Sequence, residues 1–263
     1  VQPFGGKRLS GTGPKAGGPL LLSSLCPGNA LYLTSAALSA PAALPSSAVT
    51  DTFKMIAAPD GAIDTSRLTF FCRWLRTQGH VDLADMGESW QKQPIQCGRQ
   101  WLLSGPTGEQ NIYILNGRGT ALCLADTEKD LLLHTLLALN TGNCPVWLDT
   151  PSNRTLYAQI VAADSIVVTW MRESLDWSAM TEPDLPNVVL FSGTQDALSS
   201  LCKDVSQGAG PLVSVLPCSY GMLNKCDEPE MLWGQWMLRL VHESVISVNT
   251  TATGGNTSLM VSQ

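Results

Sequence analysis

The chain has 263 residues, and its 16 Lys and Arg against 22 Asp and Glu give a formal net charge of −6. This acidic balance argues against a surface for nucleic acid or an anionic membrane, because both need clustered cations. Charged residues make up 14% of the chain, against about 25% in typical globular proteins. Hydrophobic residues make up 44%, enough for a buried core. We expect a folded protein with part of its surface docked against something else.

The eight cysteines include no C-x-x-C pair, which argues against a zinc ribbon and a disulfide scaffold and favours a reduced, cytoplasmic setting. The sequence starts at Val1 without a signal-peptide pattern, so we expect a piece of a longer polypeptide. The apolar stretch 31–49 is interrupted by Pro41 and Pro45, and we predict no membrane span there.

The first hundred residues differ from the rest in composition and in hydrophobic pattern. Val1 to Pro19 is rich in Gly and Pro, which indicates a turn-forming loop that lines something. The range 66–78 predicts an amphipathic helix, because Leu68, Phe71, Cys72 and Leu75 follow helical spacing and Gly79 can end it.

Beyond Trp101 the pattern alternates between strands and helices. We predict strands at 111–115, 120–125, 145–148, 166–170, 188–191 and 212–216, and helices at 127–141, 154–163 and 195–207. Asn116-Gly117 predicts a tight turn that joins the first two strands as a hairpin or as another closely paired arrangement. Strands separated by helices predict a parallel, Rossmann-like α/β sheet.

Three motifs resemble one family. QPFGGKRLSGTGPKAGGP (Gln2 to Pro19) resembles the end of an aldehyde dehydrogenase catalytic domain as found in the proline utilization A (PutA) family. SVNTTATGGNTSLM (Ser247 to Met260) resembles the motif that ends the longer PutA proteins, and SGPTGEQNIYIL (Ser104 to Leu115) resembles their C-terminal region.

This resemblance implies a bifunctional enzyme, in which an FAD-dependent proline dehydrogenase passes its product internally to an NAD-dependent L-glutamate-γ-semialdehyde (pyrroline-5-carboxylate) dehydrogenase. It implies four segments here. They are the end of the aldehyde dehydrogenase domain (1–25), a partly helical spacer (26–98), a Rossmann-like domain (99–245) and an extended terminal motif (246–263). The Rossmann-like domain would be a non-catalytic lid and scaffold.

By the same resemblance, FAD and NAD would bind elsewhere in the parent enzyme, and the partner of this region would be the remainder of its own chain. No nucleic-acid contact by this region is expected, and the parent could form a homo-oligomer in the cytoplasm or be peripheral to the inner membrane. Two alternatives stay open: a stand-alone NAD-binding, aldehyde dehydrogenase-like enzyme, and an α/β interaction module.

The resemblance also assigns substrate contacts. Phe4 would form one wall of the aldehyde slot, with Gly5, Gly6 and Ser10 shaping the loop around it. An ordinary buried Phe is the alternative. Four tail residues would support docking as an extended segment: Asn249, Gly254, Gly255 and Asn256.

The cofactor site of aldehyde dehydrogenases is expected to be altered in this chain. The turn at Gly193-Thr194 is similar to an aldehyde dehydrogenase pyrophosphate turn, but Gln195 and Leu198 replace the Thr and Gly of that pattern. Asp149 follows the buried strand where active relatives carry Lys. The G-x-G-x-x-A run at 11–16 lacks the strand before it and the helix after it.

We expect no catalytic residue in this chain. Cys218 lacks the setting of a nucleophile, and no Glu is found in the run 212–221. Cys218, Cys226 and His242 are too scattered to predict a metal site, and His134, in a leucine-rich helix, is expected to pack or lie at the surface.

Overall fold

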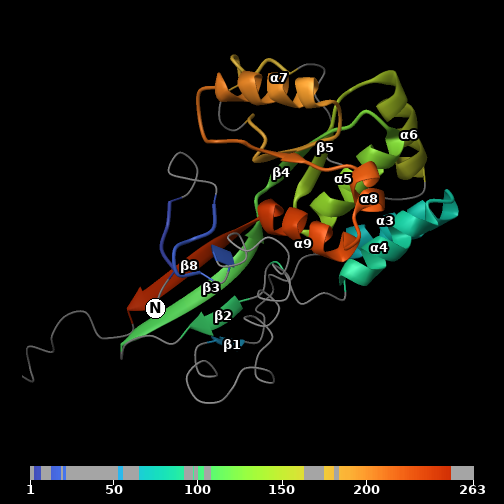
Figure 1. The fold of residues 1–263 in the computed structure, drawn as a ribbon. Helices are drawn as coiled ribbons and strands as arrows, with labels where there is room; N and C mark the ends of the chain where they lie inside the picture. The colour runs from blue at the N-terminus through green and yellow to red at the C-terminus, as the bar shows by residue number, and fades with distance from the viewer. Residues whose placement is uncertain are drawn as a thin grey trace, which may run out of the picture.

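The described part of the chain forms two four-stranded sheets, and most of its helices gather around one of them (Figure 1). The computed structural model describes residues 3–6, 13–18, 20–21, 53–55, 65–91, 97, 100–103, 108–162, 175–180 and 184–249. In these ranges, no helix combines the length and the apolar character that a bilayer crossing requires.

The first sheet is parallel, with the order β5 (Cys144–Trp147), β4 (Thr120–Leu124), β6 (Val188–Phe191), β7 (Ser214–Pro217). Its central strands are almost entirely buried, as expected when helices cover both faces of a parallel sheet. This confirms the predicted Rossmann-like α/β class. The strand predicted at 166–170 lies outside the described residues.

Helices connect these strands. α5 (Glu128–Asn140) follows β4, α6 (Pro151–Ala162) follows β5 and α7 (Gln195–Ser206) follows β6. α5 begins as predicted, since the side chain of Thr127 accepts a hydrogen bond from the amide of Asp130 at 3.1 Å. Gly142, at φ 70°, lies in the left-handed region just beyond its end.

Four further helices complete the packing: α3 (Ser66–Thr77), α4 (Val81–Gln91), α8 (Tyr220–Lys225) and α9 (Pro229–Leu240). α3 confirms the helix predicted from its periodicity. All four apolar residues that defined the pattern are buried, and Gly79 beyond its end has φ 86°. Arg76 in its last turn donates to Asp85 and Glu88 of α4, at 2.8 and 2.9 Å.

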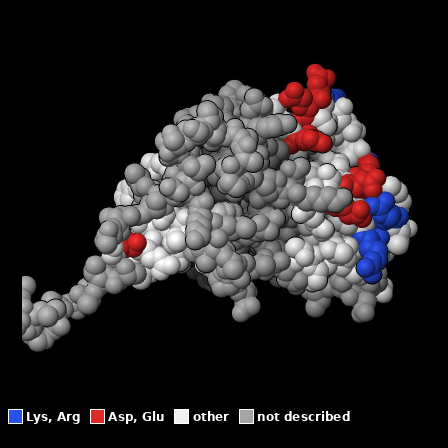
Figure 2. Space-filling view, turned by 90° about the horizontal axis from the view of Figure 1, so that it is seen from below, with Lys and Arg blue, Asp and Glu red and all other residues white. Residues whose placement is uncertain are grey.

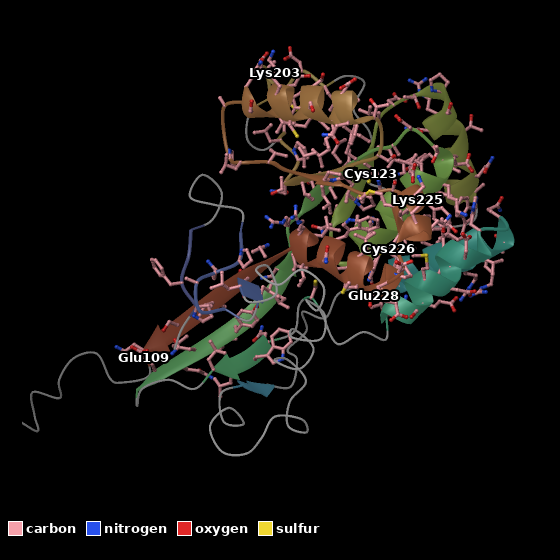
Figure 3. The ribbon with its side chains drawn as sticks, viewed as in Figure 1. Glu109, Cys123, Lys203, Lys225, Cys226 and Glu228 are labelled. Atoms are coloured by element: carbon pink, nitrogen blue, oxygen red, sulfur yellow. The ribbon has the colours of Figure 1, made fainter. Side chains whose placement is uncertain are left out.

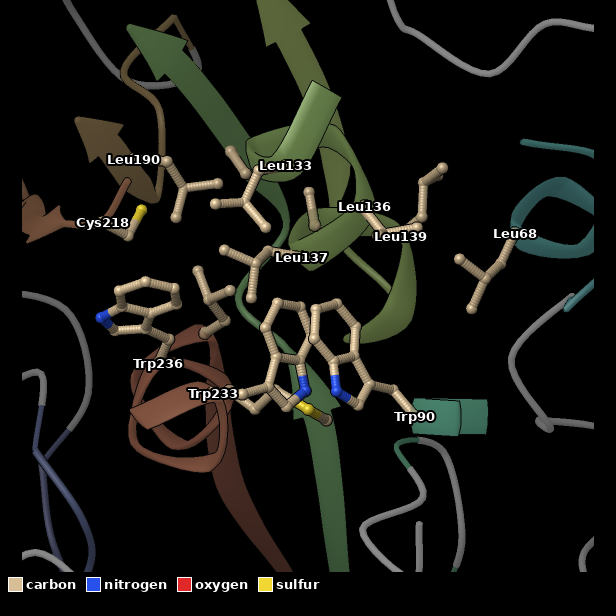
Figure 4. Packing of buried hydrophobic residues seen from close by; sticks show 14 of the residues in the cluster. Leu68, Trp90, Leu133, Leu136, Leu137, Leu139, Leu190, Cys218, Trp233 and Trp236 are labelled. Atoms are coloured by element: carbon tan, nitrogen blue, oxygen red, sulfur yellow. The ribbon is translucent and has the colours of Figure 1, made fainter. Parts of the chain in front are cut away.

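One hydrophobic core links the helices to both sheets. The rings of Trp90 in α4 and Trp233 in α9 stack next to Leu137 of α5 (Figure 4). The same cluster includes Leu68 of α3 and Tyr113 of the second sheet. Helices α3 and α4, which fall within the predicted spacer, therefore share their core with the α/β unit. The domain boundaries themselves stay a prediction.

The second sheet is antiparallel, with the order β1 (Phe53–Met55), β2 (Gln100–Leu103), β3 (Glu109–Gly117), β8 (Val241–Asn249). The ladder between β3 and β8 runs from the pair Glu109 and Asn249 to the pair Gly117 and Val241. The extended C-terminal segment predicted from residue 246 thus begins inside a strand, and its residues from 250 onward lie outside the described residues.

The predicted hairpin at Asn116-Gly117 is wrong. These residues continue β3 opposite His242 and Val241, and β4 belongs to the parallel sheet instead. A Cβ at Gly117 would lie 2.7 Å from the carbonyl oxygen of Thr141, so glycine serves a close backbone approach here. The chain turns at Gly119, which has φ 122°.

Candidate functional site

The N-terminal strip, defined as residues 3–6 and 13–18, lies along the antiparallel sheet (Figure 1). Its two pieces are joined by a bridge in which Phe4 and Ala16 exchange main-chain hydrogen bonds of 3.0 and 2.8 Å. The ammonium group of Lys15 donates to the carbonyl of Gly5 at 2.8 Å. The strip is thus internally paired rather than an isolated loop.

The predicted slot residues are exposed on this strip. The side chain of Phe4 is 82% exposed, and Gly5 and Gly6 next to it are exposed as well. The alternative of an ordinary buried Phe does not hold in this chain. Ser10 lies outside the described residues. Of the predicted docking residues, Asn249 ends β8, whereas Gly254, Gly255 and Asn256 lie outside them.

A buried carboxylate that the sequence analysis did not single out holds the strip to the sheet. Glu243 of β8 is 4% exposed and accepts hydrogen bonds from the hydroxyl of Tyr113 and from two main-chain amides of the N-terminal region. Its signal in the sequence is an acid on the apolar side of an alternating strand, between Val241 and Val245. Buried acids of this kind need partners.

The carboxyl edge of the parallel sheet is where cofactors bind in open α/β folds. Here a side-chain hydroxyl accepts from an amide at the start of each of the four helices that begin at this edge. The acceptors are Thr127 at α5, Thr150 at α6, Thr194 at α7 and Ser219 at α8. These hydroxyls satisfy amides that an anion would otherwise contact.

Two carboxylates lie at this edge, and one of them is paired with a cation. The carboxylate of Asp126 would lie 3.3 Å from a Cβ placed on Gly193, and the ring of Phe191 would lie 2.6 Å from it. Asp149 is paired with Arg154, and this hydrogen bond holds the pKa of the Asp149 carboxyl below its usual value. Asp126 therefore places a charge of the wrong sign for a phosphate at the turn that resembles a pyrophosphate turn, and the ring of Phe191 takes up space beside Gly193.

Cys218 lies at the same edge but is 1% exposed, beside Leu190 (Figure 4). Burial raises the pKa of its thiol, which therefore stays protonated at neutral pH and is a poor nucleophile. Nε2 of His134 lies 2.9 Å from the Cys218 carbonyl. Burial lowers the pKa of His134 to about 4, so this side chain is a neutral, packed histidine.

The predicted metal candidates do not converge. Cys218 follows β7 of the parallel sheet, and Cys226 follows α8, one residue after Lys225 (Figure 3). His242 belongs to the antiparallel sheet. Within the described ranges, no group of three or more His, Cys, Asp or Glu side chains is arranged to hold a metal ion.

None of the protein-family models matches this chain. Among curated proteins, it is 36% identical over 264 residues to the bifunctional protein PutA of Salmonella typhimurium, and 35% identical over 265 residues to that of Escherichia coli. Each alignment covers 99% of this chain and 18% of the relative. The chain therefore spans less than a fifth of the length of the relatives it matches.

Solved structures overlap the chain partially. A Bradyrhizobium japonicum PutA mutant aligns at 20% identity and a TM-score of 0.39, over 57% of this chain and 15% of that one. Lactaldehyde dehydrogenase from Escherichia coli aligns at 14% identity and a TM-score of 0.42, over 58% and 38%. The sequence alignments, which cover nearly the whole of this chain, are the stronger finding, and by them the chain belongs to the PutA family and corresponds to a part of the longer PutA sequence.

Proposed function

We propose that this chain is the C-terminal portion of a cytoplasmic bifunctional enzyme that oxidises proline to glutamate, and that it acts there as a non-catalytic lid and scaffold. The alignment of nearly the whole chain to part of the bifunctional PutA proteins supports this. Its partner is the aldehyde dehydrogenase domain of the parent chain. The labile semialdehyde then passes between the two active sites under its cover.

The outer face of the antiparallel sheet carries the proposal. We define this face by Ile112, Ile114, Ile246 and Val248, which share one side of β3 and β8 because side chains alternate along a strand. Ile246 and Val248 are 47% and 43% exposed, and β8 is the last strand of its sheet in the described part of the chain. Exposed apolar residues at a sheet edge mark a surface for another segment.

Charge distribution supports docking on this side. In the view of Figure 2, the described acidic and basic side chains gather toward the end where α3 and α4 lie, and the opposite end is mainly uncharged or grey. Several of the charges pair with each other, as Arg76 does with Asp85 and Lys129 with Asp82 at 2.6 Å. The residues that define the outer face are all uncharged, so covering them removes no charge of that face from water.

The carboxyl edge of the parallel sheet supports the non-catalytic part of the proposal. One amide at each helix start is capped, Asp126 carries the wrong charge for a phosphate, and Cys218 is a protonated, buried thiol. We therefore propose that this chain binds neither NAD nor FAD. Both cofactors would bind in other parts of the parent, where the described residues take no part.

At the two ends of the chain, the proposal assigns contacts to the catalytic domain. Phe4, with Gly5, Gly6 and Ser10, would line the aldehyde slot in the parent. The terminal motif would continue from Asn249 as an extended segment on the dehydrogenase domain, and Gly254-Gly255 with Asn256 would allow main-chain pairing at close range.

The test uses the full-length parent enzyme with Ile246→Asp and Val248→Asp combined. Two buried carboxylates would oppose docking, so we expect proline oxidation to stay unchanged and the coupled formation of NADH from proline to develop a lag as the intermediate escapes. Deletion of residues 250–263 should produce a lag of the same kind. Leu212→Asp, at an apolar position 57% exposed outside the outer face, is the matched control.

A coupled reaction without a lag in both the double variant and the deletion would contradict the lid function. A lag of equal size in Leu212→Asp would show that the effect comes from added surface charge and not from the outer face. Loss of proline oxidation in the double variant would contradict the assumption that this region serves only the second reaction.

A further inference from the structure

Glu243 joins three separate segments of the chain. Its Oε1 accepts from the Tyr113 hydroxyl at 2.8 Å and from the Leu20 amide at 3.3 Å, and its Oε2 accepts from the Lys15 amide at 2.5 Å. The two amides precede Glu243 by more than 220 residues. One carboxylate on β8 thereby connects the strip, the amide of Leu20 and the centre of β3.

The Glu243 carboxylate requires these hydrogen bonds because it is buried. A buried acid that lacks donors is strongly destabilising, so the two amides and the phenol are needed where they lie. Burial, and then the charge of Glu243, raise the pKa of the Tyr113 hydroxyl, which keeps its proton and donates. Trp101 packs against the Tyr113 ring, at 5.7 Å between centroids, and holds it in place.

The glycine-rich motif fits this carboxylate. A Cβ on Gly18 would overlap the Oε1 atom of Glu243 and would lie 3.0 Å from the Lys15 carbonyl. Gly18 also donates its amide to that carbonyl at 3.0 Å. Glycine is therefore required so that the backbone can curl around the Glu243 side chain.

The position of Phe4 follows from this arrangement. Glu243 fixes the amide of Lys15, the next residue Ala16 exchanges two hydrogen bonds with Phe4, and the Lys15 ammonium holds the carbonyl of Gly5. Phe4 itself is 82% exposed, so packing within the described part of the chain does little to fix it. Its direction depends on the main chain beneath it.

We propose that Glu243 is a positioning residue, whose carboxylate fixes the N-terminal strip and through it the direction in which Phe4 faces the aldehyde substrate. This role rests on the proposed function of Phe4 in the aldehyde slot. It assigns to β8, far along the chain, a direct influence on the aldehyde reaction. The carboxylate acts through the strip and touches no substrate.

The experiment compares Glu243→Gln, Tyr113→Phe and Phe4→Ala in the full-length parent, with Glu230→Gln on the exposed start of α9 as the matched control. Two kinds of measurement are made. The first is deuterium uptake by the peptide that carries Lys15 and Leu20, and the second is the steady-state kinetics, with KM and kcat for the aldehyde and for NAD. Glu243→Gln presents an amide donor to at least one N–H that needs an acceptor. Tyr113→Phe removes one donor and leaves both main-chain contacts.

For Glu243→Gln we expect deuterium uptake about tenfold faster at the strip, and kcat/KM for the aldehyde lower by about tenfold. The KM for NAD should not change, which a general loss of folded protein would not explain. Tyr113→Phe should show both effects more weakly, and it keeps the test open if Glu243→Gln fails to fold. Glu230→Gln should match the wild type.

Unchanged uptake in both Glu243→Gln and Tyr113→Phe would overturn the proposal, because the strip would not depend on the carboxylate. Faster uptake in Glu243→Gln with unchanged aldehyde kinetics, while Phe4→Ala impairs them, would overturn the positioning role alone. Unchanged aldehyde kinetics in Phe4→Ala as well would instead overturn the proposed slot function on which this role rests.

Discussion

The carboxyl edge of the parallel sheet and the outer face of the antiparallel sheet differ in whether their groups find partners within the chain. At the edge, helix amides, carboxylates and the Cys218 carbonyl find partners within the chain. On the outer face, Ile246 and Val248 stay exposed, as does Phe4 on the nearby strip. A surface whose groups are already satisfied gains little from a ligand, whereas an exposed apolar one gains by being covered.

Loss of the tryptophan stack should destabilise the core around the parallel sheet. Trp233→Ala removes a side chain 1% exposed that stacks on Trp90, and it should lower the free energy of unfolding by about 3 to 5 kcal/mol. Urea unfolding of the isolated chain measures this. Met222→Ala, at a position 42% exposed on α8, should change it by less than about 1 kcal/mol. Similar losses in both variants would contradict the core described here.

Acid should lower the free energy of unfolding through His134. Its pKa is lowered from 6.5 to about 4 by burial, so below pH 6.5 the unfolded chain binds a proton that the folded chain does not. Stability from this group is complete above pH 6.5 and falls by about 3 kcal/mol as the pH drops to 4. Urea unfolding across this range should be less pH-dependent in His134→Gln by that amount. Parallel curves for the two proteins would show that His134 is not a neutral, buried side chain.

Phe4→Ala should sharpen the contrast, because it changes function without changing stability. In the full-length parent we expect kcat/KM for the aldehyde to fall about tenfold to a hundredfold, or about 1.4 to 2.7 kcal/mol. In the isolated chain, the free energy of unfolding should change by less than about 0.5 kcal/mol, since the side chain is exposed. A stability loss without a kinetic effect would make Phe4 a structural residue.

Local patterns predicted the local structure well. The spacing of Leu68, Phe71, Cys72 and Leu75 predicted α3, and Thr127 predicted the start of α5, because caps and amphipathic faces act within a few residues. The turn predicted at Asn116-Gly117 was wrong, because these residues pair with β8 instead. The paired residues of β3 and β8 are more than 120 positions apart in the sequence. Helix α9 and strand β8 were not predicted either.

Residues of the candidate site could be proposed from the sequence only where a motif indicated them. The resemblance pointed to Phe4, Gly5 and Gly6, and the structure places them together on an exposed strip. Glu243 was missed because two of its partners are main-chain amides, which leave no mark in side-chain identity. Its acidic side chain on the apolar side of β8 and the glycine at position 18 are the two signals that could have indicated it.

Binding of NAD to the isolated chain tests the central claim most directly. The claim is that the parallel sheet keeps a nucleotide-binding architecture without a working site, so the chain can serve only as a cover. Isothermal titration calorimetry with NAD should show binding no tighter than the millimolar range, because Asp126 opposes the pyrophosphate and a side-chain hydroxyl caps an amide at each helix start. A dissociation constant in the micromolar range would contradict the account.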